Sequence, residues 1–219
     1  MRLKSDYLLI KAEVERRGIT SLVHFTPTIN LMGIIEHNAL KSRESLENLD
    51  IEVFDLLDYV KFTDDIRYDD KSYINLSITR PNQNLLKAFM ERTKDDPTID
   101  WCVLTVSTDV LLWEETLFSV TNAASIAAKL HGVGGTVEHF NKMFAEELSL
   151  KYLKKRSNGQ PSNQPTDIQA EVLVRNEIPL SLIHKISFRN QASLSSTKAA
   201  LSFLDHSALI FDVNESVFL

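Results

Sequence analysis

His24 is the first side chain in this sequence whose position suggests chemistry. It lies inside the short apolar segment 21–25 and is followed by Thr26. A histidine next to a backbone turn could hold a sugar hydroxyl and an amide, because its ring and the neighbouring main chain offer both donors and acceptors. A buried histidine with its hydrogen bonds satisfied is the simpler interpretation of the same pattern.

Arg67 and Glu171 are the two charged side chains whose positions also suggest chemistry. Arg67 stands within a run of acids at 64–70, where it could form either a diphosphate clamp oriented by carboxylates or a surface ion pair. Glu171 and Gln169 alternate along the apolar segment 169–174, so a strand there would place both side chains on one face. A solvated surface glutamate is the simpler interpretation of Glu171 alone.

Metal and dinucleotide-fold chemistry have weaker support in the sequence. The six histidines show neither His-x-His nor His-Glu-x-x-His spacing, and Cys102 is the only cysteine, so we expect no metal. The glycine-rich segment 131–135 follows a predicted helix and lacks the six-residue dinucleotide spacing. It is better explained as a turn between two helices.

The composition is that of a globular protein. The chain has 219 residues, 43% of them hydrophobic and 25% charged, which predicts a single domain over residues 1–219. Its net charge of −6 requires any nucleic-acid surface to be local. A lone cysteine and the absence of an apolar run near about 18 residues favour a soluble cytoplasmic protein in a reducing compartment.

Helical and strand patterns alternate along the chain. Helices are expected at 7–17, capped by Ser5 or Asp6 and ended by Gly18, and then from Thr26 and Pro27 to Asn38, at 121–130 and at 136–152. Strands are expected at 21–25, 73–79, 101–106, 169–174 and 183–188, with two more near 209 and 217. This order favours an α+β domain around a twisted, largely antiparallel sheet.

Charge is distributed unevenly. Residues 44–70 hold ten acidic and two basic side chains, a local charge of −8, whereas residues 151–198 hold eight basic and three acidic ones, a local +5. The polar segment 156–167 is expected to be a mobile loop. Three basic residues where this loop begins could meet a phosphate backbone, or could simply be a solvated helix end: Lys154, Lys155 and Arg156.

Several short segments, in this order along residues 20–188, resemble the DarT toxins, bacterial ADP-ribosyltransferases that modify nucleic-acid bases. The segments are Leu22-Val23-His24-Phe25-Thr26 with Asn30-Leu31 and Ile34-Ile35, Asp65-Ile66-Arg67-Tyr68-Asp69, Ile74-Asn75-Leu76-Ser77-Ile78 with Pro81-Asn82, Phe118 with Asn122-Ala123-Ala124-Ser125, Met143-Phe144, and Gln169-Ala170-Glu171-Val172-Leu173-Val174 with Ile178-Pro179. The details around Arg67 and Pro81-Asn82 are more similar to the guanine-modifying branch than to the thymine-modifying one.

The resemblance implies a split antiparallel core whose cleft takes NAD as a substrate. It implies that Glu171 and Arg67 are catalytic. It assigns NAD binding to His24, Thr26, Asn30, Arg67, Tyr73 and Ser77, and nucleic-acid binding to Lys154, Lys155, Arg156 and Gln169. Tyr73 and Tyr152 are candidates for stacking on a base. An antitoxin partner is expected, because unrestrained DNA modification would be lethal.

The chemistry of NAD cleavage fits these residue types. Breaking the nicotinamide glycosidic bond develops positive charge on the ribose, which a carboxylate such as that of Glu171 would stabilise more in the transition state than in the ground state. The leading hypothesis is therefore ADP-ribose transfer onto a base of single-stranded DNA, with guanine as the expected base. The alternatives are an RNA-directed transferase of the same fold, a catalytically silent NAD-binding or interaction module, and an NAD hydrolase.

Overall fold

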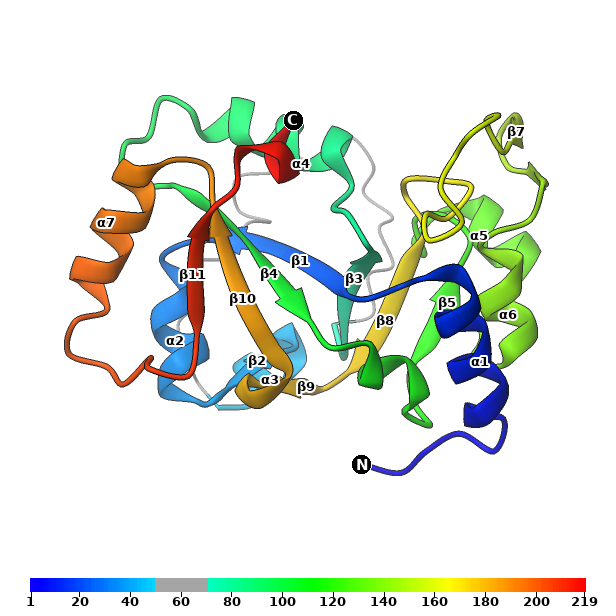
Figure 1. The fold of residues 1–219 in the computed structure, drawn as a ribbon, viewed down its shortest axis with the longest axis horizontal. Helices are drawn as coiled ribbons and strands as arrows, with labels where there is room; N and C mark the ends of the chain where they lie inside the picture. The colour runs from blue at the N-terminus through cyan, green and yellow to red at the C-terminus, as the bar shows by residue number, and fades with distance from the viewer. Residues whose placement is uncertain (50–70) are drawn as a thin grey trace.

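The fold is built on a seven-stranded sheet, seen in a computed structural model that describes residues 1–49 and 71–219 (Figure 1). The strand order is β11-β10-β4-β1-β3-β8-β5, and every pairing is antiparallel except that of β10 with β11. The strands are β1 (Leu22–Pro27), β3 (Tyr73–Ile78), β4 (Trp101–Val106), β5 (Leu117–Ser119), β8 (Glu171–Arg175), β10 (Ile183–Phe188) and β11 (Ile210–Val213). The predicted α+β class with a largely antiparallel sheet is confirmed.

Short elements complete the fold. Two separate two-stranded antiparallel sheets are formed by β2 (Ala39–Lys41) with β9 (Glu177–Pro179), which lie far apart in the chain, and by β6 (Glu147–Ser149) with β7 (Leu153–Lys155). The helices are α1 (Tyr7–Arg17), α2 (Asn30–Glu36), α3 (Arg43–Glu47), α4 (Gln83–Thr93), α5 (Ile126–His131), α6 (Val137–Lys142) and α7 (Gln191–Ala200), with 3-10 turns η2 (Thr108–Leu112), η3 (Leu180–Leu182) and η4 (Glu215–Phe218). Among the described residues, no helix has the length and apolar character needed to cross a membrane.

Helices cluster at the two ends of the sheet. In Figure 1, α7 lies beside the edge strand β11, whereas α1, α5 and α6 gather near β5 at the other edge. The alternating burial of β3, with Ile74, Leu76 and Ile78 inside, agrees with the period-two pattern of its sequence. The opposite face of β3 is therefore available to a site.

The sheet separates between β1 and β3. β1 pairs with β4 at all six of its positions, but with β3 only at Leu22–Ile78 and Val23–Ser77. Beyond Val23 the ladder between β1 and β3 is open. The next residue along β1 is His24, so the sequence places a histidine where the split begins.

The start of the chain confirms both predicted ends of the first helix, α1 at Tyr7–Arg17, but not the predicted start of the second helix. Gly18 ends α1 in the left-handed conformation, with φ of 65°, as predicted. The Asp6 side chain does not cap α1, and instead accepts a 2.7 Å hydrogen bond from the Val137 amide of α6. Thr26 and Pro27 do not begin a helix. They extend β1, because they pair with β4, and α2 begins at Asn30.

Three predicted elements in the second half of the chain are too long or of the wrong type. Residues 121–125 form a loop, and α5 begins only after Ser125, whose side chain accepts from the Ala128 amide. The expected helix 136–152 ends at Lys142, and the chain continues into the β6–β7 pair. The predicted strand near 217 is the turn η4. In the 136–152 segment Phe140, Met143, Phe144 and Leu148 are buried, as their spacing predicts, but from different backbone conformations, which periodicity alone does not distinguish.

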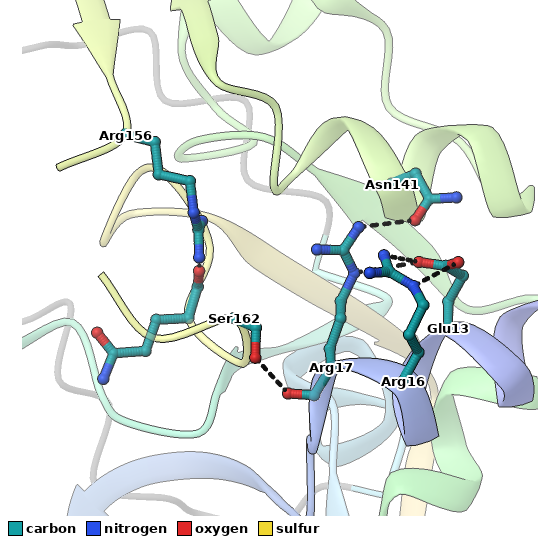
Figure 2. A network of polar contacts seen from close by, with 7 residues as sticks. Glu13, Arg16, Arg17, Asn141, Arg156 and Ser162 are labelled. Carbon is teal, nitrogen blue, oxygen red and sulfur yellow. Dashed lines mark hydrogen bonds and ion pairs between the residues drawn. The ribbon is translucent and has the colours of Figure 1, made fainter. Parts of the chain in front are cut away.

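The segment 156–167 is anchored rather than mobile. The Arg156 guanidinium donates to the carbonyls of Gln164 (2.8 Å) and Pro161 (2.6 Å), which closes the loop on itself. Figure 2 shows the Ser162 hydroxyl directed at the Arg17 carbonyl, a 3.0 Å hydrogen bond to the end of α1. The Arg17 guanidinium in turn lies 4.0 Å from the Phe144 ring centroid. Hydrogen bonds therefore order a segment whose composition offers little apolar burial.

Lys4 gives a prediction about stability. Its side chain is 5% exposed, and its amine donates to the carbonyls of Thr116 and Glu114. Burial lowers its pKa from 10.5 to about 8. Below pH 8 the Lys4 amine is charged in both the folded and the unfolded state, so folding bears the full cost of desolvating the charge. Above pH 10.5 the amine is neutral in both states, and this cost is absent. Folding stability should therefore rise between these values because of Lys4.

The measurement is urea unfolding of the wild type and Lys4→Met from pH 7 to 10.5. The wild type should gain about 2 to 3 kcal/mol relative to the variant over this range. Lys11→Met on the exposed face of α1 is the control, and its difference from the wild type should stay flat. A flat difference for Lys4→Met would show that the Lys4 amine is hydrated in the folded state.

Candidate active site

His24 bridges the split between β1 and β3. Its Nδ1 lies 3.0 Å from the backbone oxygen of Asn75 on β3. Because a carbonyl only accepts, Nδ1 carries the proton and Nε2 is left as an acceptor. Burial lowers the pKa of His24, and the hydrogen bond to Asn75 opposes this only in part. The ring is therefore neutral at neutral pH, with an acceptor nitrogen suited to a hydroxyl.

Glu171 lies on the next strand and is held at both carboxylate oxygens. Its Oε1 accepts from Asn75 Nδ2 at 3.2 Å, and its Oε2 accepts from the Ala123 backbone amide at 2.8 Å. The residue begins β8 and pairs with Ser119 of β5. A half-buried carboxylate with two fixed donors is preorganised, so it stabilises a nearby positive charge without having to reorient.

Asn75 joins the two candidate residues and was not among the predicted site residues. Its carbonyl accepts from His24 and its amide donates to Glu171, so a single residue of β3 sets both. The period-two alternation of the predicted strand 73–79 does put Asn75 on its polar face, with Tyr73 and Ser77. Its importance follows from the cross-strand position of β3 between β1 and β8, which a single sequence does not contain.

Thr26 and Asn30 come together at the end of β1. Thr26 is buried and lies two residues after His24, and its Oγ1 accepts a 3.0 Å hydrogen bond from Asn30 Nδ2 at the start of α2. This arrangement is consistent with the prediction that both residues lie near His24. Their role in holding NAD stays a prediction.

The β3 residues Tyr73 and Ser77 lie on the same half-buried face as Asn75. Ser77 also lines a small depression together with Arg80, Gln164 and Ile168, next to the first residues of β8. The structure therefore brings His24, Glu171 and this face of β3 into one region. Arg67 lies outside the described residues, so its position relative to them is not part of the structure.

The predicted nucleic-acid-binding residues lie in three different settings. Lys154 and Lys155 are on β7, and the Lys155 amine forms a 2.7 Å ion pair with Glu147 on β6. Arg156 is occupied in closing its own loop, as described above. Gln169 does not share a strand face with Glu171, because β8 begins at Glu171 and Gln169 lies in the preceding turn. The backbone amide of Gln169 donates to Asp167 Oδ1 at 3.1 Å.

Cys102 and the glycine-rich segment take no part in the site. Cys102 is fully buried on β4, and burial raises the pKa of its thiol, which suppresses the reactive thiolate. Gly132, Gly134 and Gly135 lie in the turn between α5 and α6, as predicted. Within residues 1–49 and 71–219, no three His, Cys, Asp or Glu side chains come together as a metal site.

An antiparallel sheet split beside a neutral histidine, with a fixed carboxylate across the split, defines an NAD-dependent ADP-ribosyltransferase. The family model described as "ssDNA thymidine ADP-ribosyltransferase, DarT" matches residues 23–218. The chain belongs to the DarT family. This confirms the resemblance to the DarT family found in the sequence, though not its guanine-modifying branch, and with it the predicted enzyme class and the use of NAD. No curated protein matches significantly.

Solved structures show the same fold. DarT from Thermus sp. 2.9 in complex with carba-NAD+ has a TM-score of 0.61 at 15% identity, covering 91% of this chain and 98% of that one. The same protein in complex with ADP-ribosylated ssDNA has a TM-score of 0.57 at 12% identity, covering 92% and 97%. Thermosipho africanus DarTG in complex with ADP-ribose has a TM-score of 0.58 at 16% identity, covering 91% and 51%.

Proposed function

We propose that this enzyme transfers ADP-ribose from NAD to a guanine base of single-stranded DNA, and that it acts as a toxin restrained by an antitoxin. The observation that carries the proposal is the fixed pair of Glu171 oxygens, joined through Asn75 to His24 at the split in the sheet. The similar Thermus protein bound to ADP-ribosylated ssDNA and the similar DarTG protein support the acceptor and the antitoxin.

In the proposed reaction the bond between the ribose and nicotinamide breaks, and nicotinamide leaves with the electron pair. Glu171 stabilises the positive charge that develops on the ribose, and His24 Nε2 accepts a hydrogen bond from a ribose hydroxyl. A base nitrogen forms the new bond and loses its proton, for which a carboxylate is the available acceptor. Thr26 holds the nicotinamide amide together with His24, and Asn30 and Arg67 hold the rest of the dinucleotide, with Arg67 at the diphosphate.

Guanine is favoured over thymine by the likeness of the segments around Arg67 and Pro81-Asn82 to the guanine-modifying branch. The family description names thymidine, so thymine is the competing base.

The test is a panel of single-stranded oligonucleotides, each with one guanine or one thymine in an otherwise identical context, incubated with labelled NAD. RNA versions of both and a reaction without oligonucleotide complete the panel. Label on the guanine DNA alone is expected. Label on the thymine DNA would correct the base, and label on RNA alone would correct the substrate. NAD consumption without transfer would indicate a hydrolase, and no consumption would indicate a silent module.

The β6–β7 pair provides a second prediction, about salt dependence. We propose that Lys154 and Lys155 meet phosphates, whereas Arg156 is better left intact because it closes the loop 156–168. Reversing both lysines to glutamate should weaken oligonucleotide binding and reduce the magnitude of the slope of log K against log salt by about 1.4 or more, since each phosphate contact on a single strand contributes about 0.7.

The measurement is fluorescence anisotropy of a labelled oligonucleotide from 50 to 300 mM salt. A variant carrying Lys87→Glu and Lys198→Glu has the same net charge, but its changes lie on α4 and α7, away from β7 (Figure 1). This control should keep the wild-type slope. Equal slopes for all three proteins would place the phosphate contacts elsewhere.

A further inference from the structure

The loop 120–125, between β5 and α5, contacts the catalytic carboxylate and one other buried acid. The Ala123 amide holds Glu171, as described above. Two residues earlier, Thr121 is 5% exposed, and its hydroxyl donates a 2.7 Å hydrogen bond to Asp167 Oδ2. The Thr121 carbonyl accepts from the Ser119 hydroxyl at 2.7 Å, which fixes this part of the loop to the end of β5.

Asp167 is a buried acidic residue at the inner end of the loop 156–168, where Pro165 and Thr166 are buried as well. It is 3% exposed, and its second oxygen accepts from the Gln169 amide. A buried carboxylate is costly unless hydrogen bonds satisfy it, so the Thr121 hydroxyl is a substantial part of its support. The neighbouring Thr166 donates to the Ala145 carbonyl at 2.5 Å. The inner end of the loop 156–168 is therefore rigidly placed against the loop 120–125.

The outer part of the same loop is linked to the rest of the molecule at separate points. Arg156 and Ser162 anchor it as shown in Figure 2, and the Asn163 carbonyl accepts from Thr79, just past β3, at 2.8 Å. Gln164 lines the depression next to β8. Hydrogen bonds hold the backbone between the outer part of this loop and Asp167 at both ends. A displacement of the outer part would therefore also change the position of Asp167.

We propose that Thr121 and Asp167 are positioning residues that couple the loop 156–168 to Glu171. The inference rests on the proposed function and extends it: the loop follows directly after Lys154 and Lys155, which are proposed to meet phosphates, so it too faces the nucleic acid. An acceptor strand seated against the loop restrains Asp167, Asp167 restrains Thr121, and the Ala123 amide two residues on keeps the Glu171 carboxylate against the ribose. The coupling moves no proton and forms no covalent bond. The coupling narrows the range of positions that the Glu171 carboxylate samples while the acceptor strand is bound.

The test compares Thr121→Val, which removes the hydroxyl at nearly constant shape, with Thr121→Ser, which keeps it. In the full chain, Thr121→Val should lower kcat for transfer about tenfold, the rate equivalent of one buried hydrogen bond. The KM values for oligonucleotide and NAD should change less than about twofold, because the surfaces that bind them are intact. NAD hydrolysis without oligonucleotide should fall less than transfer, and Thr121→Ser should retain wild-type values.

Hydrogen exchange of the free protein gives a readout that needs no substrate. Thr121→Val should speed exchange of the amides at 122–125 and at 163–168 together, whereas Thr121→Ser should not. The coupling is overturned if the valine variant exchanges like the wild type, if it loses hydrolysis and transfer equally, or if only KM rises. If the wild type itself transfers nothing, the proposed function fails, and the exchange comparison still decides the coupling. Thr121→Ala, which also removes the hydroxyl, replaces the valine variant if that one does not fold.

Discussion

Glu171→Gln is expected to lower kcat for ADP-ribose transfer by about 10²- to 10³-fold, the effect of removing one preorganised electrostatic contact from a transition state. The amide keeps the shape of the carboxylate but not its charge. It also places an NH2 group where either Asn75 or the Ala123 amide now donates, so one of the two hydrogen bonds becomes a donor facing a donor. The measurement is single-turnover transfer from labelled NAD to an oligonucleotide.

The control is Glu177→Gln on β9, a glutamate that pairs with Lys41 outside the site. This variant should transfer at the wild-type rate. Binding of NAD to the Glu171→Gln protein should persist, seen as a thermal midpoint raised by NAD as in the wild type. A Glu171→Gln enzyme with more than about a tenth of wild-type activity would show that another group stabilises the ribose.

Sequence reasoning succeeded where local pattern was enough. The alternation at 73–78 identified a half-buried strand with a polar face, and Gly18 marked the end of α1. The order of short motifs placed His24 and Glu171 in one site, which the structure brings together through Asn75. These features depend on residues close in the chain, or on their order.

The failures share a different cause, which is tertiary context. Thr26 and Pro27 carry helix-start chemistry, but pairing with β4 keeps them in a strand. Residues 143–152 continue a helical spacing of apolar side chains, yet the chain turns into β6 and β7. The loop 156–168 has the composition of a mobile segment, and only long-range hydrogen bonds such as that of Ser162 with Arg17 anchor it. Partners more than a hundred residues away are not visible in a local window.

Asn75 is the residue whose importance for the proposed mechanism depends most on contacts between distant parts of the chain. Asn75→Asp should be the second most damaging substitution in the site. It replaces the donor 3.2 Å from Glu171 Oε1 with a second carboxylate. Two carboxylates at this distance cannot both ionise easily, so the pair holds a proton to higher pH. In the proposed mechanism transfer needs the ionised Glu171, so kcat at pH 7 should fall about 10²-fold, combining a lost hydrogen bond with a protonated carboxylate.

The pH profile separates the two contributions. In Asn75→Asp the acidic limb of kcat should move up by at least about one pH unit, so that the variant recovers part of its activity as pH rises from 6 to 9. Asn75→Ala is the matched control. It removes the donor without adding charge, and it should lose about tenfold with no movement of the limb. Both variants keep the backbone carbonyl that accepts from His24, and the pKa of His24 is lowered by burial, so His24 stays neutral over this range. An Asn75→Asp profile parallel to that of the wild type would mean that Glu171 is not the ionising group on which transfer depends.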